Sequence, residues 1–204
     1  ELGGWCLGDW CTPHEIHGAR PEIPEPFVNG IFQLRTLDRM IGLCPMIGRA
    51  DEKERLISVR SEKAKVLTEK YYDEKTGDFA GNRNSANAFA LAVGLGDERT
   101  LQNLVDHIGN GKIDTGIFGT DFVIKVLCEN GYREEAVEIL SRREYPSFGY
   151  MMENGATTLW EEWQDPRSMS HPMFGSAVKY LFYYVLGIRQ TADSTDFGKI
   201  TVEP

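Results

Sequence analysis

Apolar residues recur every three or four positions along most of this chain, which is the period of an amphipathic α-helix. The pattern predicts about seven helices, at residues 27–47, 51–72, 84–95, 97–108, 120–129, 134–143 and 174–186. Glycine, asparagine or proline follows several of these segments and marks helix ends. Between the last two helices, residues 145–158 contain turn-forming residues around a Tyr-Met-Met run, which indicates a β-hairpin.

Short connections between successive helices favour antiparallel pairing, and repeated helical hairpins build either a solenoid or a closed toroid. No motif recurs at a fixed period in the sequence, which weakens the solenoid interpretation. Residues 198–202 have the composition of a strand and lie outside the helical pattern. We therefore expect a helical domain over residues 1–191 and the start of another domain over 192–204.

The composition is that of an ordinary globular protein, with 204 residues, 41% hydrophobic and 26% charged. The net charge of −9 and the absence of any Lys or Arg block argue against nucleic acid and against anionic lipid as partners. No apolar run approaches the ~20 residues of a membrane-spanning helix. A neutral ligand such as a sugar suits this charge balance.

The four cysteines, Cys6, Cys11, Cys44 and Cys128, lack the spacing of a zinc knuckle or a redox pair. We expect buried free thiols rather than a Cys6–Cys11 disulfide. His14 and His17 lie close to Cys11 but complete no tetrahedral ligand set, so no metal and no cofactor is expected. The compartment is not readable from a chain that begins with Glu1 rather than Met, and a periplasmic or secreted location is slightly favoured.

The segment 155–163 holds the most suggestive chemistry, because Glu161 and Glu162 stand between Trp160 and Trp163. An indole face is a good platform for a sugar ring, and a carboxylate beside it is placed to act as a general base or nucleophile. The alternative is a solvated Glu pair at a helix start, with both tryptophans in the core. Composition and spacing leave both interpretations open.

Five segments resemble, in order, the motifs of one family. They are Leu7-Gly8-Asp9-Trp10, the small-residue helix at 84–92, Thr115-Gly116-Ile117-Phe118-Gly119-Thr120, Gly155-Ala156-Thr157-Thr158-Leu159-Trp160-Glu161 and Ser170-His171-Pro172-Met173-Phe174-Gly175-Ser176. Together they resemble bacterial α-L-rhamnosidases, which are inverting glycoside hydrolases. The resemblance implies an all-α fold, an incomplete (α/α)6 toroid of antiparallel helical hairpins with a short β tail. Residues 1–191 would be the C-terminal part of the catalytic domain, and 192–204 the start of a β-sandwich.

The resemblance implies that Glu161 is the general base that activates water. The family usually has Arg after this Glu, whereas this chain has Glu162. Adjacent residues do not share a face of a helix or strand, so only one of the two carboxylates serves. Motif position favours Glu161.

The same resemblance implies a set of substrate-binding residues around Glu161. They are Asp9, Trp10, Trp160 and His171, with Asp114 and Phe118 at the rim of the pocket. The general acid of the family lies in an Arg-x-Glu-Arg-x-Gly-Trp segment that this chain does not contain. The expected partners are therefore a rhamnose-containing glycoside or oligosaccharide and the remainder of the catalytic domain, and we expect the chain alone to be inactive.

Two other classes of function remain open at this point. One is a scaffold or binding module of helical hairpins, with Trp160 and Trp163 as core residues. The other is an (α/α)6 enzyme for a different sugar, either a glycosidase or a lyase. An acidic chain is poorly suited to the anionic substrate of a lyase. Fold alone does not decide among these functions.

Overall fold

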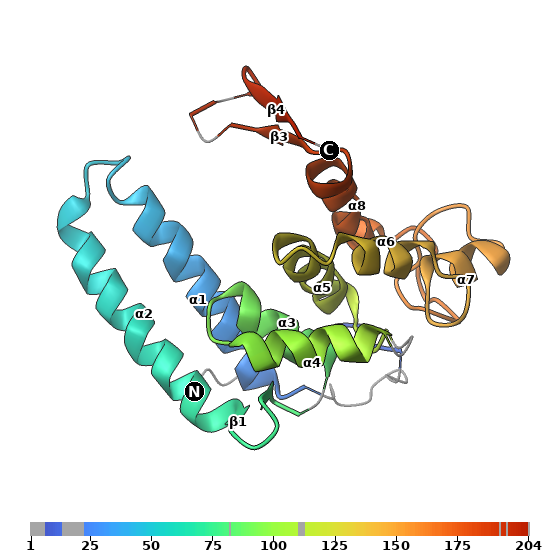
Figure 1. The fold of residues 1–204 in the computed structure, drawn as a ribbon, viewed down its shortest axis with the longest axis horizontal. Helices are drawn as coiled ribbons and strands as arrows, with labels where there is room; N and C mark the ends of the chain where they lie inside the picture. Colours follow the sequence, from blue (N-terminus) through green and yellow to red (C-terminus); the bar gives the residue numbers. More distant parts are fainter. Residues whose placement is uncertain are drawn as a thin grey trace.

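Three antiparallel helical hairpins follow one another in the computed structural model, which describes residues 7–13, 23–81, 83–109, 113–191, 193, 194 and 196–203 (Figure 1). The pairs are α1 (Glu25–Leu43) with α2 (Ala50–Tyr71), α3 (Asn84–Ala92) with α4 (Glu98–Gly109), and α5 (Ile117–Glu129) with α6 (Arg133–Ser141). These are the first six helices that the apolar period predicts, with ends shifted by a few residues. The all-α expectation is confirmed.

The hairpins are arranged in two layers. Helices α1, α3 and α5 contact one another in a row, and each carries its partner α2, α4 or α6 on the outer side. Helix α3 fits within the row because the seven residues from Asn84 to Ala90 are all buried and six of them have small side chains. Helix α5 is apolar on nearly every side, because α3, α6 and the segment after residue 171 all pack against it.

Two short antiparallel strand pairs complete the fold. Strand β1 (Tyr72–Asp73) pairs with β2 (Asp78–Phe79), and β3 (Ile188–Gln190) pairs with β4 (Ile200–Val202). The strand predicted at 198–202 is thereby confirmed, and β3 is an additional strand. The domain boundary expected after residue 191 falls between these two paired strands and stays a prediction.

The hairpin predicted for residues 145–158 is wrong. Residues Phe148–Glu153 form helix α7, whose start is capped by the Ser147 hydroxyl accepting the Tyr150 amide at 2.9 Å. In so short a segment the apolar pattern does not separate a strand from a helix, and the Ser cap decides.

The last predicted helix, 174–186, begins earlier and changes type along its length. A 3₁₀ segment (η1, Pro172–Ala177) leads through α8 (Val178–Tyr180) into a π-helical turn (η2, Leu181–Val185). The three types share similar apolar periods, so the sequence pattern did not distinguish them. Cys44 and Cys128 are buried free thiols, as predicted, and Cys11 is also buried. Cys6, His14 and His17 lie outside the described residues.

The N-terminal loop is fastened to the first turn of α5 by Asp9. This side chain is 1% exposed, and its two carboxylate oxygens accept the amides of Gly116 at 2.8 Å and Gly119 at 2.7 Å. The Ile117 amide donates to the Trp10 carbonyl at 2.8 Å. The first amides of a helix have no partner within it, and the positive end of the helix dipole favours an anion there. Asp9 therefore acts as a cap for α5 from a distant part of the chain.

Glycine is required where this loop meets the helix. A Cβ on Gly119 would stand 2.3 Å from the nearer Asp9 oxygen, and one on Gly116 would stand 2.1 Å from the Trp10 carbonyl oxygen. Both distances are far inside van der Waals contact. The glycines of the 115–120 turn are explained by this close approach.

We predict that Gly119→Ala lowers the free energy of unfolding by about 1–3 kcal/mol, because the new methyl group displaces the Asp9 carboxylate. Gly42→Ala is the matched control, since a Cβ at this exposed position in α1 meets nothing within 4 Å. The control is expected to raise stability by less than about 1 kcal/mol, through helix propensity. Urea unfolding of both variants measures the difference, and equal midpoints would contradict the docking of Asp9 on α5.

Asp9 also makes stability depend on pH. Burial raises the pKa of Asp9 to about 6, although the two glycine amides lower it. Between about pH 4 and pH 6, Asp9 therefore binds a proton more tightly in the folded state than in the unfolded state. The contribution of Asp9 to the free energy of unfolding falls as the pH rises through that window.

We predict that Asp9→Asn, which does not titrate, removes this fall. The free energy of unfolding of the natural protein minus that of the variant should fall as the pH rises from about 4 to about 6. Above about pH 6 this difference should stay level. Urea unfolding at several pH values measures it. A difference that is independent of pH would contradict this account.

Candidate active site

The structure joins the two most informative motifs of the chain through one hydrogen bond. The indole Nε1 of Trp10 donates to Oε1 of Glu161 at 3.0 Å, although the two residues are 151 positions apart. The Glu161 side chain is 14% exposed, and Trp10 is also partly exposed. A carboxylate and the edge of a partly exposed indole ring thus lie together in the described part of the chain.

Backbone pairing shapes the loop that carries Glu161. The Glu161 amide donates to the Ser168 carbonyl at 2.9 Å, and the His171 amide donates to the Leu159 carbonyl at 2.8 Å. Residues 159–161 thereby run antiparallel to 168–171, which places His171 on the strand-like segment facing the one that holds Glu161. The His171 ring is partly exposed, and its Nε2 lies 3.2 Å from the Met173 sulfur.

The two tryptophans that flank the glutamates are core residues. Trp163 is 1% exposed, packs against Phe174 with ring centroids 4.4 Å apart, and donates from Nε1 to the Thr115 carbonyl at 2.8 Å. Trp160 is 7% exposed and belongs to the same hydrophobic core. Trp160 was expected to bind substrate, yet most of its ring is buried. Trp10 offers more of its indole to a ligand.

Glu162 is hydrogen-bonded to Arg167. Its Oε1 accepts Nε of Arg167 at 2.6 Å, and its Oε2 accepts the Arg167 backbone amide at 2.7 Å. The sequence analysis did not identify Arg167. A single arginine five positions after a glutamate in an irregular loop carries no recognisable signal.

Asp114 and Phe118 occupy the start of neighbouring helices. Asp114 is buried and accepts the Asn84 amide at 3.2 Å at the beginning of α3, with Arg83 3.8 Å away. Burial raises the pKa of Asp114 above its usual range. Phe118 lies in the first turn of α5, meets Phe32 edge to face at 5.7 Å, and lines a pocket of about 370 Å³. Both expected rim residues therefore lie at helix N-termini, as Asp9 and Trp10 do.

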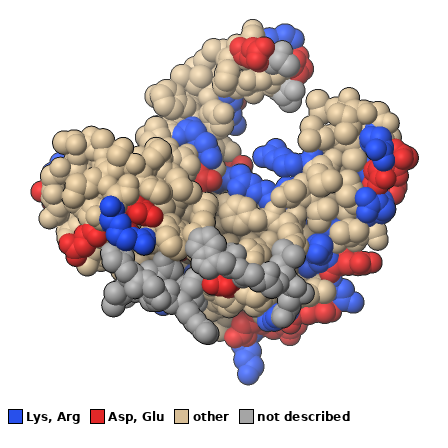
Figure 2. All heavy atoms as spheres, turned by 180° about the vertical axis from the view of Figure 1, so that it is seen from behind, with Lys and Arg blue, Asp and Glu red and all other residues tan. Residues whose placement is uncertain are grey.

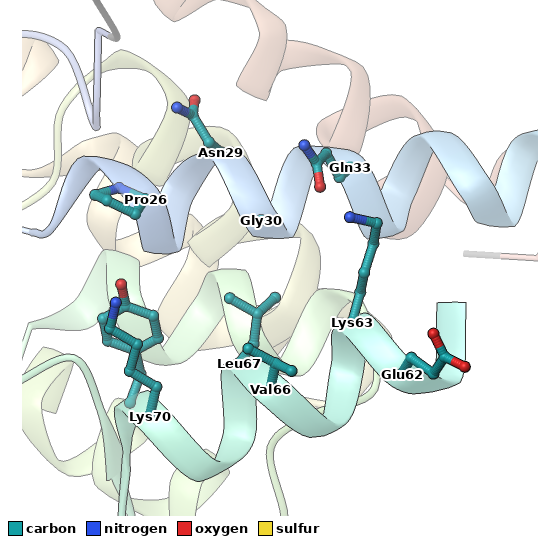
Figure 3. A pocket seen from close by; sticks show the side chains of 10 residues that line it. Pro26, Asn29, Gly30, Gln33, Glu62, Lys63, Val66, Leu67 and Lys70 are labelled. Atoms are coloured by element: carbon teal, nitrogen blue, oxygen red, sulfur yellow. The ribbon is translucent and has the colours of Figure 1, made fainter. Parts of the chain in front are cut away.

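A second hollow lies between α1 and α2, away from these residues (Figure 3). It has a volume of about 380 Å³, and Lys63 points across it from α2 toward Gln33 on α1. Its lining includes one carboxylate, Glu62, and no residue that the motifs single out. The groove thus has no counterpart of the Trp10–Glu161 arrangement.

The described part of the chain carries no candidate metal site and no candidate membrane-spanning helix. No group of three or more His, Cys, Asp or Glu side chains is placed there to hold a metal ion. None of the described helices combines the length and apolar character that crossing a bilayer requires. On the face in Figure 2, basic and acidic side chains alternate and gather into no single basic patch.

Comparison with known proteins agrees with these motifs. Residues 1–185 match the model of the bacterial alpha-L-rhamnosidase 6 hairpin glycosidase domain. An alpha-L-rhamnosidase of Formosa agariphila is 24% identical over 97% of this chain and 23% of its own length. The chain thus spans about a quarter of the length of the curated relatives it matches.

Solved structures show the same fold. An alpha-L-rhamnosidase from Dictyoglumus thermophilum superposes with a TM-score of 0.82 and 27% identity, over 97% of this chain and 23% of that one. The Streptomyces avermitilis alpha-L-rhamnosidase, solved in complex with L-rhamnose, has a TM-score of 0.83 at 20% identity, over 97% of this chain and 20% of that one. The paired helices, the ordered motifs and the family match lead to one conclusion: this chain belongs to the bacterial alpha-L-rhamnosidase family, within its six-hairpin glycosidase domain.

Proposed function

We propose that this chain is the C-terminal part of a catalytic domain that removes terminal α-L-rhamnose from a glycoside or oligosaccharide. Glu161 is the general base. The hydrogen bond from Trp10 to Glu161 is the observation that carries this proposal, because it sets a partly exposed carboxylate at the edge of an indole ring whose face is suited to a sugar. The rhamnose held by the Streptomyces avermitilis relative supports the choice of sugar.

The proposed reaction is a single displacement with inversion. Glu161 takes a proton from a water molecule while the water oxygen bonds to the anomeric carbon. The bond from that carbon to the leaving oxygen breaks, and a separate carboxylic acid protonates this oxygen. Inverting enzymes hold the two carboxyl groups ~6.5–9.5 Å apart, which leaves room for the water.

The acid of the pair is placed outside these residues. Glu162 is bound by Arg167, and Asp9 and Asp114 accept the first amides of α5 and α3. Each of these carboxylates already has a structural role beside the site. We therefore assign the acid to the remainder of the catalytic domain.

The apolar surface of the chain is consistent with such a remainder. Met40 and Leu43 in the second half of α1 are 45% and 50% exposed, and Phe182 in η2 is 52% exposed. Apolar surface of this kind is stabilised when another element covers it. We place further helices of the same domain against it.

The predicted substrate residues divide into two groups. Trp10 and His171 are partly exposed and are proposed to contact the sugar directly. Asp9, Asp114 and Trp160 are buried, and they are proposed to hold the loops in place. Phe118 is partly exposed and lines the pocket at the start of α5, so it is proposed to lie at the rim of the site.

We predict that Glu161→Gln in the full-length protein lowers kcat on an aryl α-L-rhamnoside by about 10²–10⁴-fold, since the amide cannot accept a proton from water. Glu153→Gln is the control, because Glu153 at the end of α7 pairs with Arg143 at the surface. It should leave kcat unchanged. Circular dichroism checks that both variants fold. Unchanged activity in Glu161→Gln would favour a scaffold role for this chain.

A further inference from the structure

We infer that Arg167 is the positioning residue of Glu161, and that Glu162 serves as the anchor of Arg167 rather than as a second catalytic carboxylate. This inference rests on the proposed role of Glu161 as the base. It assigns a role to the position at which this chain departs from the motif that it otherwise resembles, because Glu162 stands where the family usually has arginine.

Glu162 holds Arg167 at two points. One carboxylate oxygen accepts the guanidinium Nε at 2.6 Å, and the other accepts the Arg167 backbone amide at 2.7 Å. The Glu162 side chain is 11% exposed, so this pair is shielded from water on the glutamate side. These two bonds, one from the guanidinium and one from the backbone, hold the arginine beside Glu162. The hydrogen bond to Glu162 also raises the pKa of Arg167, which keeps it charged.

The anchored guanidinium reaches the proposed base. Its Nη2 lies 3.6 Å from Oε1 of Glu161, and its central carbon stands 5.4 Å from the centre of the Trp10 ring. A cation at this distance from an aromatic face is attracted to it. Arg167 thus lies close to both Trp10 and Glu161 while it is hydrogen-bonded to Glu162.

The two contacts on Glu161 converge on the same oxygen. Oε1 accepts the Trp10 indole and faces Arg167, whereas Oε2 receives no hydrogen bond from the described residues. With one oxygen held, rotation of the carboxylate is restricted and Oε2 is left to accept the proton of the attacking water. The positive charge of Arg167 also offsets the repulsion between the adjacent carboxylates of Glu161 and Glu162.

The test compares Arg167→Ala and Arg167→Lys in the full-length protein, with kcat, KM and the melting temperature measured on an aryl α-L-rhamnoside. Because a small misplacement of a reacting group is costly, Arg167→Ala should lower kcat by about ten- to hundredfold with KM changed by less than about threefold. Arg167→Lys keeps the charge without the guanidinium group and should give an intermediate kcat.

Arg60→Ala is the control for loss of another arginine that is paired with a carboxylate. Arg60 is bound to Asp38 and to the Val93 carbonyl, and none of these residues contacts Glu161. The control should lower the melting temperature and leave kcat unchanged. If Arg167→Ala behaves in the same way, with kcat within about threefold of the natural protein, the inference is wrong.

A charge exchange separates positioning from mere loop closure. In the double variant Glu162→Arg, Arg167→Glu, an ion pair still closes the loop, but a carboxylate now faces Glu161. The inference expects kcat to stay as low as in Arg167→Ala, and recovery of kcat would overturn it.

The proposed function fails separately, if Glu161→Gln itself keeps its activity. An inactive Glu161→Gln beside fully active Arg167 variants would reject only the role of Arg167.

Discussion

The buried carboxylate of Asp9 at the N-terminus of α5 is the interaction on which the site depends. Its oxygens accept the amides of Gly116 and Gly119, and a side chain on either glycine would collide with the loop that carries Asp9. The helix end supplies unpaired amides and a positive dipole, which offset the cost of burying a carboxylate. Trp10 follows directly in the chain and is therefore held at a fixed place beside α5.

The same helix end also holds the loop of the proposed base. The Trp163 indole donates to the Thr115 carbonyl, one residue before the glycine that binds Asp9. Two segments from opposite ends of the chain thus meet at one turn, and Trp10 reaches Glu161 across it. The geometry of the proposed site is a consequence of this shared attachment. Loops that are held at both ends keep a reacting group oriented without help from the substrate.

Much of the fold could be predicted from periodicity, because paired helices bury one face each and six of them have long apolar patterns. Helix α7 was missed because the helical form of so short a segment depends on its Ser147 cap. The apolar pattern does not distinguish a 3₁₀, α or π helix, so it did not predict the type of the last helix. Motif order singled out Glu161 and Trp10, which the structure brings together, and their role in catalysis stays a prediction. Motif order did not show that Trp160 and Trp163 are buried, or that Glu162 is bound by Arg167, since those facts depend on which side chains the folded loop brings together.

A crystal structure of the full-length protein with bound L-rhamnose tests the central claim most directly. The account predicts the sugar against Trp10, with Oε2 of Glu161 within hydrogen-bonding distance of a water molecule or hydroxyl group at the anomeric carbon. Oε1 should remain bound to the Trp10 indole. A rhamnose bound away from Trp10, or one whose anomeric carbon faces Glu162 in place of Glu161, would contradict it.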